Sequence, residues 1–520
     1  MKTFVIMLLL GCALHAEAQP VERIIRVETG GGPAADGSDE RPFGRISDAV
    51  RLAVLLKQRR VASRVEIGPG TYREGPIEFG YSNHTSNDPT NATVIEVVAR
   101  EPGTVVISGS DVFSDWKHDE SGLYWHEWAR RWGVSPNPWA GEAEMTDIVL
   151  RRELLFVSGE RQRQVLERSA LTDGTFLVDE ARGRIWLKPG PDVDLDESLV
   201  EVGVRDVLWD QNHEDHVTVR GLVFQHAATP WEVAKAAVRV SASDGTRFEH
   251  CTIVDTNWTG LYVGESAGVR LRNLVLNHNG GQGWAMFRVR DLVVEDSETS
   301  YNNWRGALGG FTGWSIGNKI LSAHRLRIYN HRAIENASRG LWLDYDIADV
   351  VVDSLVAVGN KRDGIWIEAS QGPITVTRST ISGNAEAGIH STFSRNVVVD
   401  SNIIEGNGEA QLKIGGASTR VVRDFESGRD LHLSAGGWVI TRNVFGISSD
   451  NASDGVLTVL RTEAMSNADW SGFARTVVSN ENVFDAAESA VVFQVLGRRM
   501  GLTSWRRLTG QDGRSAARGS

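Results

Sequence analysis

The sequence predicts an all-β chain folded as a right-handed parallel β-helix, a solenoid in which each turn of the chain adds one coil. Three observations predict this fold. Glycine-led strand patterns recur at nearly constant spacing, most coils carry a second short strand, and Asn/Gly corners separate successive strands. A helical solenoid is excluded because the apolar runs are short, β-branched and alternating.

The strand-leading glycines set the register of the repeat. They open the segments Gly260-Leu-Tyr-Val-Gly264, Gly283-Trp-Ala-Met-Phe287, Gly306-Ala-Leu-Gly-Gly310, Gly340-Leu-Trp-Leu-Asp344, Gly364-Ile-Trp-Ile-Glu368 and Gly388-Ile-His-Ser-Thr392. Successive glycines lie 23, 23, 34, 24 and 24 residues apart. The long step predicts an ordinary coil plus an insertion of about ten residues, placed around 311–320.

The N-terminus carries an export signal. In residues 1–18, Lys2 is followed by an apolar run and then by Ala16-Glu17-Ala18, a small-x-small cleavage pattern that predicts a signal peptide. The alternative is a lipoprotein box at 9–12, with Cys12 as the lipidated residue. Both interpretations predict a periplasmic or extracellular protein, and no later segment has a membrane-spanning pattern.

Four further segments follow the signal. Residues 19–110 are expected to form the first coils and a cap, because the helical pattern at 46–57 suits a plug for the open end of a solenoid. Residues 111–205 predict an inserted antiparallel β-sandwich, since their strands are short and alternating with tight turns. The main β-helix with the active site is expected at 206–496, and an extended Arg- and Gly-rich tail at 497–520.

Composition favours a carbohydrate ligand. The chain has 17 tryptophans, whose flat rings stack on sugar faces. Its 55 Lys+Arg against 67 Asp+Glu, a net charge of −12, argue against nucleic acid as a partner. Cleavage of the signal would leave Cys251 as the one cysteine, so no internal disulfide is expected.

Asp344 and Glu368 occupy the same position in two successive coils. Strand side chains alternate between faces, so the apolar residues fill the coil while Trp342 with Asp344, and Trp366 with Glu368, project outward. The two tryptophans are therefore candidates for substrate binding. Neighbouring strands lie about 4.8 Å apart, and a retaining glycosidase needs its two carboxyl groups roughly 5–5.5 Å apart. The repeat therefore predicts a two-carboxylate double displacement.

The electrostatics of the pair fit this chemistry. Two adjacent carboxylates beside aromatic surface do not easily both ionise, so one pKa is expected to rise while the other stays low. The group of low pKa would act as nucleophile and the other as acid/base, and spacing alone does not assign the two roles. Asp346 projects outward in the same register and is expected to hold a partner or a sugar hydroxyl.

The paired motif resembles that of the β-helical retaining β-xylosidases, glycoside hydrolase family 120. Gly340-Leu-Trp-Leu-Asp344 and Glu368-Ala-Ser-Gln-Gly-Pro373 are similar to that family's Gly-Ile-Trp-Leu-Asp and Glu-Val-Asn-His-Gly-Pro. His226-Ala-Ala-Thr-Pro-Trp231 and Gly317-Asn-Lys-Ile320 also resemble stretches of the family.

The resemblance implies Asp344 as nucleophile, Glu368 as acid/base and a sandwich inserted after the first coils, with plant or algal oligosaccharide or polysaccharide as substrate. The mechanism requires no metal or organic cofactor. The sequence departs from the family at Tyr345-Asp346 and at Ser370-Gln371, and the latter makes Gln371, beside the acid/base, a candidate substrate contact.

Further candidates for substrate binding each have a structural alternative. Corner packing would explain Trp304 and Arg305, and a solvated side chain would explain Lys319. His226 and Trp231 rest on the family resemblance. His390 lies in the column of Trp366, where stacking would also explain it.

Two other functions fit the same fold. In a polysaccharide lyase or epimerase, Asp344, Asp346 and Glu368 would hold Ca²⁺ against a uronate carboxylate, with Lys413 or Lys319 as the base. In a non-catalytic glycan-binding protein, the tryptophan ladder would bind sugar and no turnover would occur.

Overall fold

The computed structural model describes residues 21–79, 90–137, 145–232, 234–306, 317–416, 419–447 and 455–518. The expected signal peptide and Cys12 lie outside the described residues. Among the described helices, none is long and apolar enough to cross a membrane.

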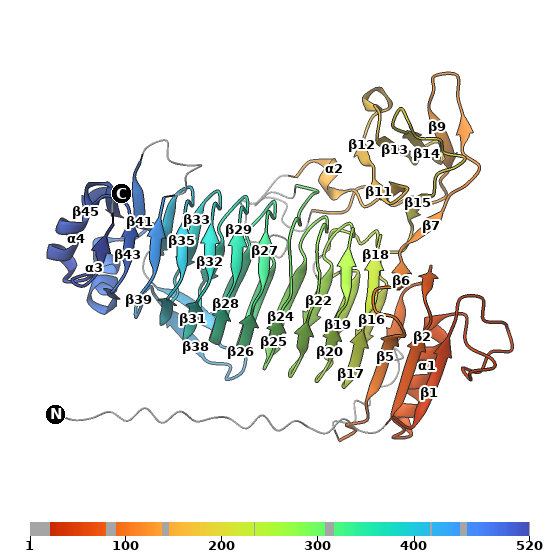
Figure 1. Ribbon diagram of the computed structural model, residues 1–520, viewed down its shortest axis with the longest axis horizontal. Coiled ribbons are helices and arrows are strands. Elements are labelled where there is room, and N and C mark those ends of the chain that lie inside the picture. Colours follow the sequence, from red (N-terminus) through yellow and green to blue (C-terminus); the bar gives the residue numbers. More distant parts are fainter. Residues whose placement is uncertain are drawn as a thin grey trace.

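Parallel strands stack coil upon coil along the long axis of the molecule and form a β-helix (Figure 1). One large sheet wraps around two faces of the coils. Its strands are β1 (Arg23–Val27), β2 (Ser63–Ile67), β4 (Ile77–Phe79), β5 (Ile95–Ala99), β16 (Trp209–Asn212), β17 (Val217–Arg220), β19 (Val238–Ser241), β20 (Arg247–Glu249), β22 (Leu261–Gly264), β23 (Arg270–Arg272), β24 (Trp284–Arg290), β25 (Val293–Glu295), β26 (Lys319–Tyr329), β28 (Leu341–Asp353), β30 (Ile365–Glu368), β31 (Ile374–Thr377), β33 (Ala387–Thr392), β34 (Val397–Asp400), β36 (Ala410–Gly415), β39 (Val439–Thr441), β41 (Leu457–Glu463), β42 (Val478–Asn480), β44 (Val491–Val495) and β45 (Arg498–Gly501).

Two further sheets complete the remaining face of the solenoid. The first contains β3 (Gly70–Tyr72), β6 (Val105–Ser108), β18 (Leu222–Gln225) and β21 (Thr252–Val254). The second contains β27 (Arg332–Ile334), β29 (Val356–Val358), β32 (Thr380–Ser382), β35 (Ile403–Glu405), β40 (Val444–Gly446), β43 (Val483–Asp485) and β46 (Ala516–Ala517). The inward side chains of all these strands share one apolar core along the axis.

The predicted Asn/Gly corners hold the coils in register. Gly359 and Gly383 take φ values of 68° and 62°, a left-handed conformation that glycine adopts without steric cost. The asparagines that follow them are buried and stack from coil to coil. Asn336 Nδ2 donates to Asn360 Oδ1 at 2.9 Å, and Asn360 Nδ2 donates to Asn384 Oδ1 at 2.9 Å. This polar ladder satisfies groups that burial would otherwise penalise.

One strand of the predicted repeat is wrong. The strand next to β28 is not the segment that begins at Gly306 but β26, in which Ile320 pairs with Met286 on one side and with Leu343 on the other. Residues 307–316 lie outside the described residues. The inserted residues therefore precede the strand, and Lys319 belongs to the strand itself.

Between Ser110 and Gly203 the chain leaves the solenoid and forms two small sheets (Figure 1). One contains β7 (Ser110–Val112), β10 (Leu155–Val157), β11 (Glu160–Arg161) and β15 (Val200–Gly203). The other contains β8 (Lys117–His118), β9 (Tyr124–Glu127), β12 (Arg163–Val165), β13 (Thr175–Asp179) and β14 (Arg184–Lys188). All strand pairs are antiparallel except β12 with β13, and the two sheets share an apolar cluster. The short helices α2 (Asp147–Leu150) and η1 (Arg168–Ala170) lie between these strands in the sequence.

Helices lie at both ends of the solenoid. At the N-terminal end, α1 (Ile46–Gln58) buries one apolar face in the axial core. At the C-terminal end lie α3 (Asn467–Thr476), η3 (Glu488–Ala490) and α4 (Leu502–Thr509). The predicted extended tail is wrong, because Trp505 of α4 is buried and stacks on Phe493 at 4.3 Å, and β46 pairs with β43.

Candidate active site

A column of aligned side chains crosses five successive strands. Lys319 pairs in register with Trp342, Trp342 with Trp366, Trp366 with His390, and His390 with Lys413. The two indole rings stack at 4.4 Å with an interplanar angle of 20°, and Trp366 stacks on the His390 ring at 5.3 Å. The predicted column is thus present, with Lys319 in the place that the sequence pattern gave to residue 308.

The tryptophans are covered rather than open to solvent. Trp342 has no exposed surface, because Lys319 Nζ lies 3.7 Å from its ring centre and Trp366 lies against its ring. The guanidinium of Arg339 lies 4.1 Å from the ring of Trp366. Both rings project outward from the coil, as predicted, but neighbouring side chains cover them, so no open ring face supports the prediction that Trp342 binds substrate.

Asp344 and Glu368 are direct register partners on β28 and β30, as predicted. Their side chains are 9 % and 6 % exposed. Each carboxyl group has one oxygen bound to a cation. Asp344 Oδ2 lies 2.7 Å from Lys319 Nζ, and Glu368 Oε1 accepts a hydrogen bond from Arg420 Nη1 at 2.7 Å.

The remaining oxygen of each carboxyl group, Asp344 Oδ1 and Glu368 Oε2, is buried and has no hydrogen-bond partner among the described residues. A buried polar atom without a partner is unfavourable unless a ligand or water meets it. The two oxygens are therefore available to a ligand or to water.

The environment distinguishes the two carboxyl groups. Burial and the nearby charge of Asp344 raise the pKa of Glu368, while Arg420 and Lys319 oppose that rise. A raised pKa keeps a carboxyl group protonated and able to act as an acid. This property fits Glu368 for the acid/base role, a choice that spacing alone left open.

Arg420 reaches Glu368 from a hairpin that the sequence pattern did not predict. The hairpin consists of β37 (Arg420–Arg423) and β38 (Asp430–Leu433), an antiparallel pair between β36 and β39. Val422 and Leu433 pack against Ala369 and Tyr345 of the solenoid. The signal available in the sequence was the long stretch between β36 and β39, in which residues 430–433 alternate between polar and apolar side chains.

Asp346 does not lie beside the carboxyl pair but holds protein partners, one of the two roles expected for it. Tyr345 and Asp346 have φ values of 49° and 66°, so the strand turns a corner there and the alternation of faces is interrupted. Asp346 is fully buried. Its Oδ1 accepts from Gln371 Nε2 at 2.7 Å, and its Oδ2 accepts from His324 Nε2 at 3.2 Å and from the Phe425 amide at 2.8 Å. Gln371 is thus also directed to this network and not to the carboxyl pair.

The same network is the one group of described residues whose ligand atoms lie close enough together to hold a metal ion. His324, Asp346 and Asp424 offer atoms within 4.8 Å of one another. Gln371 Nε2 donates to both Asp346 and Asp424, so these side chains are satisfied by one another. The group does not include Asp344 or Glu368, so the calcium site expected for a lyase or epimerase is not assembled from the three predicted residues.

Lys413, the alternative base, is bound to Glu409 and Glu463.

A second buried ion-pair network lies beside the tryptophans. Asp363 accepts from Arg339 Nε at 3.1 Å and from His390 Nδ1 at 3.4 Å. Although burial opposes its charge, His390 and Arg339 lower the pKa of Asp363 to about 2. Burial lowers the pKa of His390, but its bonds to Asp363 and Glu463 outweigh that effect and raise it. His390 therefore supports the column by charge as well as by stacking.

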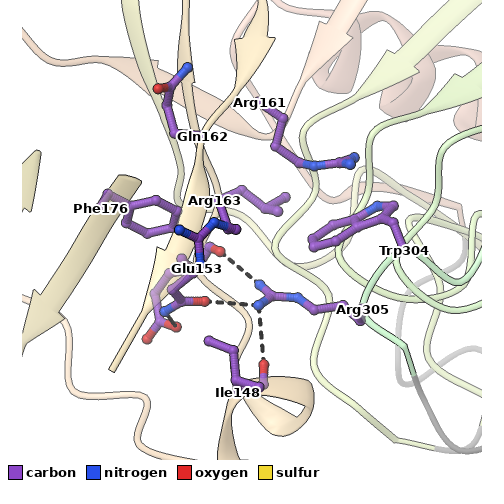
Figure 2. A pocket seen from close by; sticks show the side chains of 10 residues that line it. Ile148, Glu153, Arg161, Gln162, Arg163, Phe176, Trp304 and Arg305 are labelled. Carbon is purple, nitrogen blue, oxygen red and sulfur yellow. Dashed lines mark hydrogen bonds between the residues drawn. The ribbon is translucent and has the colours of Figure 1, made fainter. Parts of the chain in front are cut away.

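Trp304 and Arg305 are placed away from the column, where the inserted sheets meet the solenoid (Figure 2). Arg305 donates to Gln164, to the carbonyl oxygens of Ile148 and Glu153, and to Asn257. Arg305, Trp304, Gln164, Ile148 and Glu153 border a cavity of about 320 Å³. Burial lowers the pKa of Arg305 to about 9. The hydrogen bonds of Arg305 are all to protein groups, so the contacts agree with corner packing, the structural alternative to substrate binding.

His226 and Trp231 also belong to this junction. His226 stacks on Phe156 of the inserted sheets at 3.7 Å, and burial lowers its pKa to about 4. Trp231 packs on Trp258 at 4.7 Å in a cluster that includes residues of α2. The predicted substrate contacts of these two residues are not supported, because both side chains connect the inserted sheets with the solenoid.

Comparisons with known proteins agree with this architecture. The family model for the right-handed β-helix region matches residues 236–404 and 357–473. The structure of XylC in complex with xylose matches with a TM-score of 0.68 at 15 % identity, covering 95 % of this chain and 86 % of that chain. The A-module of the mannuronan C-5 epimerase AlgE6 of Azotobacter vinelandii gives a TM-score of 0.49 at 11 % identity, covering 91 % and 94 %. No curated protein matches the sequence. The fold is a right-handed parallel β-helix.

Proposed function

We propose that the protein is a carbohydrate-active enzyme, a retaining glycoside hydrolase in which Asp344 is the nucleophile and Glu368 the acid/base. One observation carries this proposal. The two carboxyl groups are register partners on adjacent strands, and each has one oxygen bound to a cation and one buried oxygen without a partner among the described residues. Adjacent strands provide the separation that double displacement requires.

In the first step, Asp344 Oδ1 attacks the anomeric carbon while Glu368 gives its proton to the leaving glycosidic oxygen. In the second step, Glu368 takes a proton from water, which displaces Asp344 from the sugar. Lys319 stabilises the negative charge of Asp344 before attack and after release. Arg420 stabilises the charge that Glu368 acquires when it loses its proton.

The substrate class rests on two further points. The Asp344 and Glu368 motifs resemble those of family 120 β-xylosidases, and the described fold is similar to that of XylC, which was solved with xylose. We therefore propose a β-xyloside or a related glycoside of plant or algal origin as the substrate. We also propose that the protein is exported, on the basis of the pattern in residues 1–18.

The two alternative functions have less support from the geometry. A lyase built on Asp344, Asp346 and Glu368 would need Asp346 beside the pair, but Asp346 is bound to His324 and Gln371. A glycan-binding ladder would need open tryptophan faces, but Trp342 is fully buried.

The test is a screen of aryl glycosides with proton NMR of the first-formed sugar. We expect hydrolysis of an aryl β-xyloside with the β-anomer appearing first, unchanged activity in EDTA, and a new reducing end. Direct appearance of the α-anomer would rule out Asp344 as the nucleophile. Loss of activity in EDTA with an unsaturated product would instead establish the lyase.

A further inference from the structure

The hairpin that carries Arg420 is fastened to the solenoid by a separate set of contacts, which we call the clasp. The clasp consists of His324, Asp346, Phe425 and Glu426. We propose that the clasp is a positioning device for the active site, because it fixes the hairpin so that Arg420 stays on Glu368. This inference rests on the proposed function, which it extends to residues that do not touch the reacting groups.

The hairpin needs such a fastening. A two-stranded hairpin is marginally stable by itself in water. Arg420 stands at the first residue of β37, and its side chain is 38 % exposed. A long, partly exposed arginine side chain is held in one geometry only when the backbone that carries it is fixed. The position of Arg420 therefore depends on how the hairpin docks.

The clasp supplies the polar part of that docking. Asp346 is fully buried and accepts a hydrogen bond from the Phe425 amide at 2.8 Å, which ties the hairpin loop to the corner of β28. His324 lies between Asp346 and the loop. Its Nδ1 lies 2.9 Å from Glu426 Oε2, and its ring packs on Phe425 at 4.4 Å. Removing either partner leaves buried polar groups unpaired.

A second set of contacts fixes the orientation of the loop. Arg325 donates from Nη1 and Nη2 to the two carboxylate oxygens of Glu426, at 2.9 and 2.7 Å. On the other side of the hairpin, the Arg423 amide donates to Tyr345 Oη at 3.1 Å. The hairpin is thus held at its loop and along β37, and Arg420 is the first residue of that strand.

The clasp also shares backbone with the catalytic pair. Asp344 and Asp346 belong to the same strand, β28, and Gln371 follows Glu368 after a corner. Gln371 Nε2 donates to Asp346 and to Asp424 of the hairpin loop, at 2.7 and 3.0 Å. The hairpin, the corner of β28 and the segment after Glu368 therefore form one bonded unit.

The predicted consequence is specific. Arg420 lowers the pKa of Glu368, so a loosened hairpin lets that pKa rise further. The high-pH limb of the kcat/KM profile reports the pKa of the acid/base residue. When the pKa of Glu368 rises, this limb therefore moves to higher pH. A substitution in the clasp should produce the same displacement as a substitution of Arg420, although His324 does not contact Glu368.

The experiment compares H324A, E426Q, R420M and the double variant H324A/R420M with H432A. His432 is exposed on β38, so H432A is a matched control for H324A on the same hairpin. We expect R420M to shift the high-pH limb of kcat/KM upward by about one pH unit. H324A and E426Q should shift it in the same direction, and the double variant should shift it no further than R420M. H432A should leave it in place.

Hydrogen exchange of residues 420–433 gives a readout that does not need activity. We expect faster amide exchange in this segment for H324A and E426Q and wild-type exchange for H432A. Unchanged exchange in the clasp variants, or lost activity without a displaced limb, overturns the inference. If the wild-type protein hydrolyses no glycoside, the proposed function fails, and exchange still decides whether the clasp fixes the hairpin.

Discussion

Lys319 Nζ lies 2.7 Å from Asp344 Oδ2, although the two residues come from successive coils. Both side chains are buried, so each charge depends on the other. The lysine also lies over the ring of Trp342, which fixes its side chain. The proposed nucleophile is therefore held from the preceding coil.

Replacing Lys319 tests whether the buried charge of Asp344 depends on this cation. We expect K319M to lower the free energy of unfolding by about 3 kcal/mol, because it leaves Asp344 buried without its cation. We expect kcat/KM on an aryl β-xyloside to fall by about tenfold or more. Denaturant unfolding and steady-state kinetics measure the two effects. K361M, at an exposed lysine, serves as the control and should change neither.

The assignment of the nucleophile is tested by D344N. Without a charged oxygen to attack the anomeric carbon, kcat should fall by about 10⁴-fold. Asp349 lies on the same strand and is half exposed in a pair with Arg327, so D349N is a matched control. If D344N kept a tenth of wild-type kcat, while folding normally by circular dichroism, Asp344 would not be the nucleophile.

The acid/base role of Glu368 predicts the pH dependence of the reaction. Glu368 must be protonated at the start, and its pKa is raised above the ordinary 4.5, so kcat/KM should stay high above pH 4.5 and fall as pH passes the raised value. E368Q should lose this limb. With a substrate whose leaving group needs no proton, such as a 2,4-dinitrophenyl glycoside, E368A should retain far more activity than with a phenyl glycoside.

The raised pKa of Glu368 also affects the stability of the fold. A carboxyl group whose pKa is higher in the folded than in the unfolded state stabilises the fold fully below the unfolded pKa, and that contribution is lost as pH rises through the folded pKa. E368Q removes the buried charge, so we expect its Tm to exceed that of the wild type by about 2–4 °C at pH 8. The difference should shrink as pH falls toward 4. An equal Tm difference at both pH values would contradict the raised pKa.

In the ion-pair network beside the tryptophans, the pKa of Asp363 is lowered, so its effect on stability depends on pH in the opposite direction to that of Glu368. Asp363 has a pKa of about 2, so its stabilising contribution is present above its ordinary pKa of 3.8 and is lost as pH falls toward 2. D363N should destabilise the fold by about 3 kcal/mol at pH 7, because Arg339 is then buried without its partner. D430N, in an exposed pair with Arg423, should cost less than about 1 kcal/mol.

The sequence predicted the parts of the molecule that depend on the repeat. The pairing of Asp344 with Glu368 and of Trp342 with Trp366 followed from the 24-residue period and the alternation of side chains. The corners at Gly359 and Gly383 followed from the same period. Each of these features is decided by residues within one coil or its neighbour.

The features that the sequence did not predict depend on contacts outside the repeat. Arg420 donates a hydrogen bond to Glu368, which lies 52 residues away in the sequence, and no local sequence pattern predicts that contact. Tyr345 and Asp346 adopt positive φ without a glycine, so the sequence did not predict the corner that directs Asp346 to His324 and Gln371. The glycine at 306 resembles a strand-leading glycine, so the repeat pattern places Lys319 in an insertion, whereas the next strand begins at Lys319.

The stacking of coils also limits how this protein can change. Each asparagine of the buried ladder bonds to its counterpart in the next coil, so whole coils can be gained or lost near either end without disturbing residues 344 and 368. A single residue added to the strand just before Glu368 would turn that carboxyl group toward the apolar axis. Length variation among descendants of this chain should therefore be tolerated in whole turns at the ends and excluded within the two strands that carry the acids.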